Sequence, residues 1–182
     1  MNTMNSKLLE HIFVKKGDIT LEKSDAIVNA ANTSLLGGGG VDGAIHKAAG
    51  PGLLEDCKKF NGCKSGEAKI TKGYNLNAKY VIHTPGPVYR NGKSNESTVL
   101  QNSYWNSMLL VKQNNLKSVS FPAISTGVYR YPKAEAAKIA IETILRFMDD
   151  EKFITDVTFV LFDNDNYEIY KTILDGIKNE LC

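Results

Sequence analysis

Short apolar runs, separated by polar segments that contain glycine or proline, recur along the chain. Several of them lack alternation, which is typical of strands buried on both faces of a parallel sheet. The predicted strands are residues 8–14, 25–29, 67–72, 80–84, 118–122 and 157–162. Apolar residues at helical spacing, together with helix-start signals, predict the elements between them. The predicted helices are residues 41–49, 51–60, 95–114, 132–148 and 164–181.

Strands and helices alternate through the second half of the chain. This order predicts an α/β fold, a three-layer α/β/α sandwich around a mixed, mostly parallel central sheet. A length of 182 residues suits one domain with a sizeable core. The sequence has no internal repeat, low-complexity linker or visible boundary. We therefore expect a single domain over residues 1–182.

Four consecutive glycines, Gly37–Gly40, lie between the strand at 25–29 and a predicted helix. Glycine backbone can approach a ligand closely, and successive amides of such a loop can bind an anion. A helix N-terminus also favours negative charge. With Asn32 before the glycines and Asp42 after them, the stretch favours an oxyanion or phosphate site. The alternative is a plain strand-to-helix connection in which Asp42 caps the helix through the amide of Ala44 or Ile45.

A second candidate loop, Ser125-Thr126-Gly127, follows the strand at 118–122. Ligands of parallel sheets bind beyond the carboxyl ends of strands, where both loops begin. Together the two loops could hold a diphosphate through backbone amides, although the second could also be an ordinary turn before a helix. Asp18 follows the first strand. It either closes a turn or accepts a hydrogen bond from an exocyclic amine such as that of adenine.

The composition narrows the function classes. A net charge of +2 gives no reason to expect nucleic acid, and no apolar run is long enough to span a membrane. The first residues lack the order of a signal peptide, so we expect a cytoplasmic protein. The three cysteines and three histidines show no metal-ligand spacing. We expect no metal and no cofactor, with buried thiols at Cys57, Cys63 and Cys182, and histidines that pack or lie on the surface.

Four motifs together resemble the macrodomain family. They are Gly17–Thr20, Asp25–Asn32, Gly37–His46 and Pro122–Tyr129. The chain is most similar to the MacroD-type branch, which removes ADP-ribose from proteins and deacetylates O-acetyl-ADP-ribose. The resemblance extends from about residue 13 to residue 170, which would form the core of the domain. It implies binding of ADP-ribose and O-acetyl-ADP-ribose and action on mono-ADP-ribosylated proteins. Nothing in the sequence suggests more than a monomer, and the charge and apolar runs described above give no reason to expect a membrane or nucleic-acid partner.

The resemblance also implies roles for individual residues. Asp18 and the amide of Ile19 would recognise adenine. The diphosphate and the neighbouring ribose would be held by Gly39, Gly40, Val41, Ser125, Thr126, Gly127 and Val128. Asn32 and Tyr129 would hold the distal ribose, and Asp42 would orient or deprotonate the attacking water. A carboxylate in this place favours orientation over full proton removal, because the helix dipole keeps it ionised.

Three other functions are consistent with parts of the pattern. A reader module would bind ADP-ribose without hydrolysis, but such modules often lack the Asn and Asp pair that Asn32 and Asp42 supply here. A phosphatase would act on ADP-ribose 1″-phosphate. An RNA-associated regulator is disfavoured by the nearly neutral charge.

The sequence departs from the family pattern at two places. Arg130 stands where the family usually has glycine, which predicts backbone strain of about 1 kcal/mol if the position needs positive φ. If the position does not need positive φ, the side chain lies at the rim of the site. We expect Arg130 to reach solvent or the modified protein and to alter the choice of substrate rather than the reaction. Pro85 stands where a β-branched residue is common, and we expect only a stiffer strand end there.

Overall fold

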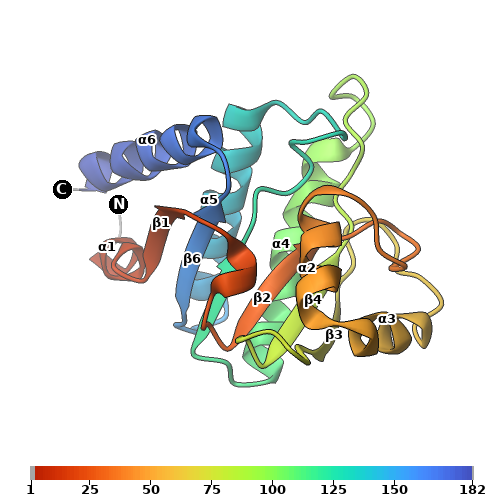
Figure 1. The fold of residues 1–182 in the computed structure, drawn as a ribbon. Coiled ribbons are helices and arrows are strands. Elements are labelled where there is room, and N and C mark those ends of the chain that lie inside the picture. The colour runs from red at the N-terminus through yellow and green to blue at the C-terminus, as the bar shows by residue number, and fades with distance from the viewer. Residues whose placement is uncertain (1–2, 182) are drawn as a thin grey trace.

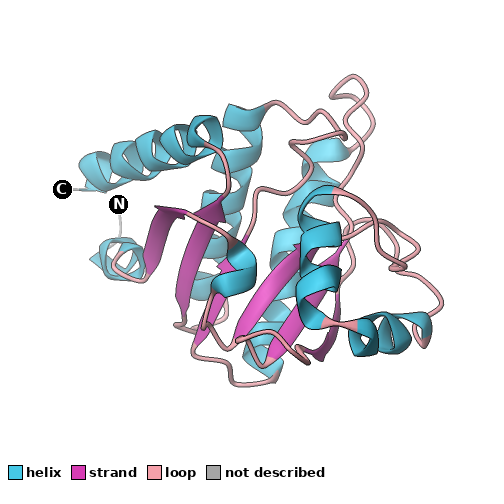
Figure 2. Ribbon diagram, viewed as in Figure 1, coloured by secondary structure: helices cyan, strands magenta, loops and turns pink. Residues whose placement is uncertain are grey.

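The computed structural model describes residues 3–181, which form a six-stranded sheet between layers of helices (Figures 1 and 2). The strands are β1 Ile12–Lys16, β2 Ala26–Ala30, β3 Lys69–Lys72, β4 Tyr80–Thr84, β5 Ser118–Phe121 and β6 Asp156–Leu161. Their order in the sheet is β1-β6-β5-β2-β4-β3. Only the edge pair β3–β4 is antiparallel among the described strands. The prediction of a mixed, mostly parallel sheet is confirmed.

Helices cover both faces of this sheet. They are α1 Thr3–Leu9, the short 3₁₀ helix η1 Ile19–Leu21, α2 Gly40–Ala49, α3 Pro51–Lys58, α4 Glu96–Gln113, α5 Lys133–Asp150 and α6 Asn164–Leu181. One apolar cluster joins the sheet to α1, α4, α5 and α6, and a second joins the opposite face to α2, α3 and η1. This arrangement confirms the three-layer prediction. Within residues 3–181 no helix has the length and apolar character to cross a membrane.

The structure corrects the first predicted strand, residues 8–14. Leu8 and Leu9 instead end α1, where they are 2% and 3% exposed and belong to the core cluster that includes α5. The His11 amide donates to the Leu8 carbonyl across 3.0 Å, and β1 begins only at Ile12. The apolar run therefore consists of a helix end followed by a strand. Cys57 and Cys63 are buried free thiols as predicted, and Cys182 lies outside the described residues.

Strand alternation places two polar side chains in the interior. In β2, Ile27 faces the α2 side of the sheet, and Asn29 follows two residues later on the same side. His83 of β4 is the register partner of Asn29 and is likewise fully buried. Both side chains therefore lie beneath α2, inside an otherwise apolar layer.

The carboxyl ends of the parallel strands lie along one edge of the sheet, the upper edge in Figure 1. Four of the segments that leave this edge matter for the site: residues 17–20 after β1, 31–39 after β2, 85–95 after β4 and 122–132 after β5. The predicted ligand-binding segments thus begin at a common edge.

Candidate active site

The carboxylate of Asp42 is buried at the start of α2. The helix begins at Gly40 with Gly39 as its N-cap, and Asp42 lies in its first turn with 5% of its surface exposed. Its Oδ1 accepts a hydrogen bond of 2.8 Å from Asn29 Nδ2. The alternative in which Asp42 caps the helix is therefore wrong, because its side chain points inward to β2 rather than to an α2 amide.

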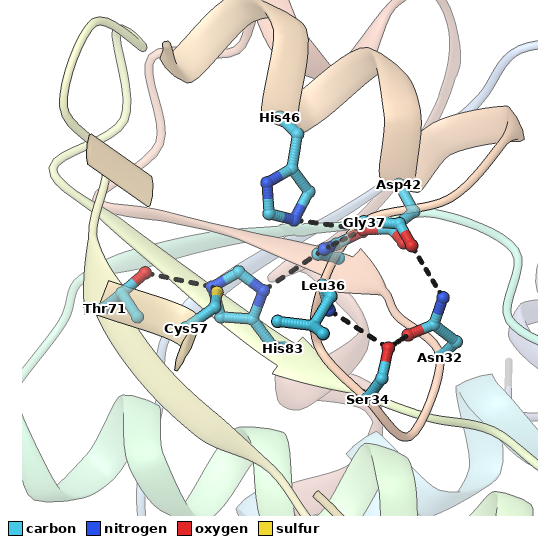
Figure 3. A network of polar contacts seen from close by, with 10 residues as sticks. Asn32, Ser34, Leu36, Gly37, Asp42, His46, Cys57, Thr71 and His83 are labelled. Carbon is cyan, nitrogen blue, oxygen red and sulfur yellow. Dashed lines mark hydrogen bonds and ion pairs between the residues drawn. The ribbon is translucent and has the colours of Figure 1, made fainter. Parts of the chain in front are cut away.

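A chain of hydrogen bonds runs from Asp42 through the sheet (Figure 3). Asn29 Nδ2 also lies 3.2 Å from His83 Nδ1, and His83 Nε2 lies 3.0 Å from Thr71 Oγ1. The Thr71 hydroxyl donates to the Lys72 carbonyl. His83 Nε2–H therefore donates to Thr71, which leaves Nδ1 as the acceptor for Asn29.

His83 stays neutral in this environment. Burial, followed by the charge of His46, lowers its pKa from 6.5 to about 3. A neutral imidazole with a fixed tautomer holds the Asn29 amide in one orientation, and this amide in turn holds Asp42 Oδ1. Sequence analysis missed Asn29 and His83. Their signal was a polar residue within a strand that is otherwise buried and apolar.

Three buried polar atoms around this carboxylate make no hydrogen bond with any residue that the structure describes. They are Asp42 Oδ2, Asn29 Oδ1 and His46 Nε2. His46 lies one turn after Asp42 on α2, and its Nε2 is 3.4 Å from Asp42 Oδ1, which is long for a hydrogen bond. Most buried polar groups are paired, so three unpaired atoms at one carboxylate indicate a functional site rather than a structural one.

Asn32 and Asp42 meet at Gly38. Asn32 Nδ2 donates to the Gly37 carbonyl across 2.7 Å, and its Oδ1 accepts from Ser34 Oγ across 2.6 Å. A Cβ atom added to Gly38 would lie 3.3 Å from Asn32 Nδ2 and 3.2 Å from Asp42 Oδ2. The structure therefore brings the two predicted catalytic side chains to the same point of the glycine loop.

The glycine loop presents an open surface. Gly38, Gly39 and Gly40 are exposed, and a Cβ added to Gly39 or Gly40 would meet no atom within 4 Å. Gly40 has a φ of 55°, and the half-buried Val41 follows it in the first turn of α2. The backbone at the start of α2 is thus accessible to an anion, as the sequence predicts.

The loop after β5 is held by its own backbone. The Ser125 carbonyl accepts from the Tyr131 amide across 2.8 Å, and the Gly127 carbonyl accepts from the Arg130 amide across 3.0 Å. Ser125 is buried and its hydroxyl makes no hydrogen bond with the described residues. Thr126 is half-buried, and Val128 is 91% exposed. β2 and β5 are neighbours, so this loop and the glycine loop leave adjacent strands.

A third loop, residues 88–95, supports the loop after β5. The Tyr89 amide donates to the Tyr129 carbonyl across 2.8 Å, and Tyr89 stacks against Tyr131 with ring centroids 4.9 Å apart. The shape of the loop at residues 88–95 depends on the buried carboxylate of Glu96, which sequence analysis missed. This carboxylate accepts backbone hydrogen bonds from Arg90, Asn91, Gly92 and Ser94. These bonds, with that of Arg90 largest, lower the pKa of Glu96 to about 2.

Arg130 adopts the strained one of the two conformations that the sequence analysis left open. Its φ is 62°, in the left-handed region, and its side chain is exposed. The position therefore strains a residue that carries a Cβ, and the guanidinium is free to meet a substrate outside the loop.

Asp18 closes a turn. Its Oδ1 accepts from both the amide and the hydroxyl of Thr20, at 2.9 and 2.7 Å, which leaves Oδ2 available to a ligand. Ile19 is buried. The Gly17 amide donates to the Leu161 carbonyl, so this turn lies beside the end of β6, where Phe162 is 84% exposed. Phe162 follows Leu161 as Asp18 follows Gly17, so an exposed aromatic residue that suits a planar base leaves the sheet beside this turn, and sequence analysis missed it.

Comparisons with known proteins give a consistent result. The sequence profile of the Macro domain family matches residues 28–140. The chain is similar to O-acetyl-ADP-ribose deacetylase of Citrobacter koseri, with 53% identity over 90% of this chain and 94% of the relative. It is 52% identical to ADP-ribose glycohydrolase MACROD2 of Mus musculus over 92% of this chain and 36% of that protein. A solved Oceanobacillus iheyensis macrodomain with ADP superposes with a TM-score of 0.87 at 45% identity, covering 92% of this chain and 91% of that one.

Proposed function

The chain belongs to the Macro domain family, and we propose that it is a hydrolase that removes mono-ADP-ribose from ester-linked aspartate and glutamate side chains and deacetylates O-acetyl-ADP-ribose. The family expected from the sequence motifs is thus confirmed. The names of the relatives from Citrobacter koseri and Mus musculus support the reaction class. ADP-ribose is the common part of both substrates.

The observation that carries the proposal is the asymmetry of the Asp42 carboxylate. Oδ1 is fixed by Asn29, whereas Oδ2 is buried and accepts no hydrogen bond from the described residues. Oδ2 also faces the point of Gly38 that Asn32 Nδ2 faces. One oxygen is therefore oriented by the protein, and the other is available to orient a water molecule beside the amide that would hold the distal ribose.

Each residue has a simple role in the proposed reaction. Asn32 binds a hydroxyl of the distal ribose and prevents the sugar from turning. Asp42 Oδ2 accepts a hydrogen bond from the attacking water and directs its lone pair to the ester. The water adds, a C–O bond of the ester breaks, and ADP-ribose and a carboxylic acid leave. Positioning of this kind lowers a barrier by several kcal/mol. The amides of Gly39 and Gly40, with the loop at 125–128, would hold the diphosphate.

The test is release of ADP-ribose from a protein modified on aspartate or glutamate. We expect rapid release by the wild type, and a loss of tenfold or more in Asp42→Ala and in Asn32→Ala with binding of ADP-ribose retained. Asp42→Asn keeps the size of the side chain and separates charge from packing. Tight binding without release from any ester would instead identify a reader, and phosphate release from ADP-ribose 1″-phosphate would identify a phosphatase.

The remaining expectations belong to the same proposal. We propose that residues 1–182 form one macrodomain that acts as a monomer in the cytoplasm on mono-ADP-ribosylated proteins. As the family resemblance implies, Asp18 and Ile19 would contact the adenosine end, Val41 the diphosphate and Tyr129 the distal ribose. Size-exclusion chromatography with light scattering tests the oligomeric state.

A further inference from the structure

A groove lies on the outer side of the glycine loop, apart from the predicted ADP-ribose contacts. It has a volume of about 470 Å³ and runs between the loop, α2 and the start of α3. Its lining includes Leu36, Gly38, His46, Lys47, Pro51 and Leu54. None of residues 39–41 or 125–129 lines it. The proposed role of the glycine loop as a phosphate grip therefore leaves the groove unexplained.

The groove is continuous with the proposed catalytic pair. Gly38 lines the groove and also borders Asp42 Oδ2 and Asn32 Nδ2. His46 lines it too, and its Nε2 is 3.4 Å from Asp42 Oδ1 (Figure 3). A polypeptide joined by an ester to the distal ribose must leave the catalytic pair in some direction. The groove begins at Gly38, which directly borders the proposed catalytic pair.

The lining has a definite chemical character. It contains the exposed cation Lys47 and the imidazole of His46, and no acidic residue. The nearest acidic neighbour along α3 is Glu55, which is paired with Lys58 at 3.1 Å. Leu36, which is 53% exposed, adds an apolar surface at the loop. Such a surface suits a peptide that carries negative charge and an apolar side chain.

We propose that this groove binds the acidic segment of the modified protein that flanks the ADP-ribosylated aspartate or glutamate. The inference rests on the proposed function and adds a substrate class, the acidic peptide, to it. O-acetyl-ADP-ribose carries an acetyl group in place of a peptide and cannot fill the groove. The groove therefore strengthens binding of protein substrates only, which changes KM more than kcat.

The experiment compares two substrates across matched charge changes. The substrates are an acidic peptide that carries one ADP-ribose on a glutamate ester, and O-acetyl-ADP-ribose. The variants are Lys47→Glu and, as control, Lys178→Glu. Lys178 is also exposed but lies on α6, which packs on the opposite face of the sheet from α2 and α3. We expect Lys47→Glu to lower kcat/KM about fivefold or more on the peptide at low salt, mainly through KM, because it places like charges together. Turnover of O-acetyl-ADP-ribose should stay unchanged in both variants.

A binding measurement keeps this inference separate from the proposed function. In the Asp42→Ala background, which prevents turnover, the modified peptide should bind about fivefold tighter than free ADP-ribose, and Lys47→Glu should remove the difference. Equal affinity for the modified peptide and for free ADP-ribose would overturn the proposed role of the groove, whatever the enzyme hydrolyses. Equal effects of Lys47→Glu and Lys178→Glu would overturn it as well. A wild type that turns over neither substrate would overturn the proposed function instead, while the binding comparison would still decide the role of the groove.

Discussion

Replacement of Asn29 by alanine tests whether the sheet orients the carboxylate of Asp42, which we propose to be catalytic. Asn29 Nδ2 is the donor to Asp42 Oδ1 at 2.8 Å and contacts His83 Nδ1 at 3.2 Å. In Asn29→Ala both acceptors lose this donor inside a buried layer. Asp42 then has neither of its oxygens fixed by β2, and its carboxylate can turn about the side-chain bonds.

The expected loss of stability in Asn29→Ala follows from the hydrogen bonds that the substitution removes. A hydrogen bond to a charged group contributes about 1.5–3 kcal/mol and one between neutral groups about 1 kcal/mol. The variant also removes Asn29 Oδ1, which has no partner among the described residues, and this offsets part of the loss. We expect the free energy of unfolding to fall by about 2–3 kcal/mol, which is a drop in Tm of roughly 5–10 °C for a chain of this size. A displacement of the carboxylate by about 1 Å would lower kcat on the order of 100-fold.

The assay measures thermal unfolding and ADP-ribose release at saturating substrate. Asn166→Ala is a matched control, because Asn166 is also buried, donates from Nδ2 to Asp163 Oδ2 at 2.9 Å and has an unpartnered Oδ1. The control should lose comparable stability and keep its kcat. Orientation of Asp42 by Asn29 is excluded if Asn29→Ala keeps kcat within about twofold of the wild type, or if both variants lose turnover equally.

Four further predictions follow from single residues. Burial lowers the pKa of His83 to about 3 in the folded chain, against 6.5 in the unfolded chain, so the unfolded chain binds a proton first as the pH falls. The free energy of unfolding should therefore decrease as the pH drops below 6.5, by about 2 kcal/mol at pH 5. Urea titrations at pH 7 and pH 5 check this. Gly38→Ala places a Cβ 3.2 Å from Asp42 Oδ2, so kcat should fall about tenfold with little change in Tm, and unchanged kcat would contradict it. Glu96→Gln replaces a carboxylate that accepts four backbone hydrogen bonds, so calorimetry should find a lower Tm and severalfold weaker binding of ADP-ribose. Arg130→Gly removes left-handed strain of about 1 kcal/mol, so the Tm of this variant should be higher than that of Arg130→Ala. In both variants the ratio of turnover on modified protein to turnover on O-acetyl-ADP-ribose should change. Unchanged turnover on every substrate would exclude a role of Arg130 in substrate choice.

The fold could be predicted largely from the apolar pattern. Buried parallel strands such as residues 25–29 and 118–122 are short, mostly apolar runs without strict alternation, and among the helices between them α2 ends before Gly50 and α4 before Asn114. The pattern failed where two elements share one apolar run. Leu8 and Leu9 pack as the last turn of α1, and a run of the same hydrophobicity continues into β1, so the sequence alone does not mark the boundary.

The sequence pointed to the loops of the candidate site but not to its interior. The glycine loop and Asp42 are adjacent in sequence, so their chemistry can be recognised together. Asn29 and His83 are separated by 54 positions, and only the register of β2 against β4 makes them partners. Glu96 is likewise indistinguishable in sequence from an ordinary acidic residue in the first turn of a helix. Pairing between strands and loop closure are tertiary facts that local patterns do not contain.

The interior of the site favours a hydrolase over a reader. A module that only binds ADP-ribose needs backbone amides and loop hydroxyls, which residues 37–41 and 125–128 would supply without help from a buried carboxylate. Asp42 Oδ2 and Asn29 Oδ1 are buried without a hydrogen-bond partner among the described residues, and the buried His46 Nε2 has only its 3.4 Å contact with Asp42 Oδ1. An unsatisfied buried polar group costs about 1–3 kcal/mol, so these atoms lower the stability of the fold. Such local violations are expected where function requires them, and here they lie around the carboxylate oxygen proposed to orient water. Buried atoms without a hydrogen bond also occur elsewhere, for example at Ser125, Asp149 and Asn166, but those around Asp42 lie beside the proposed catalytic pair, and a purely binding role gives no physical reason for them there.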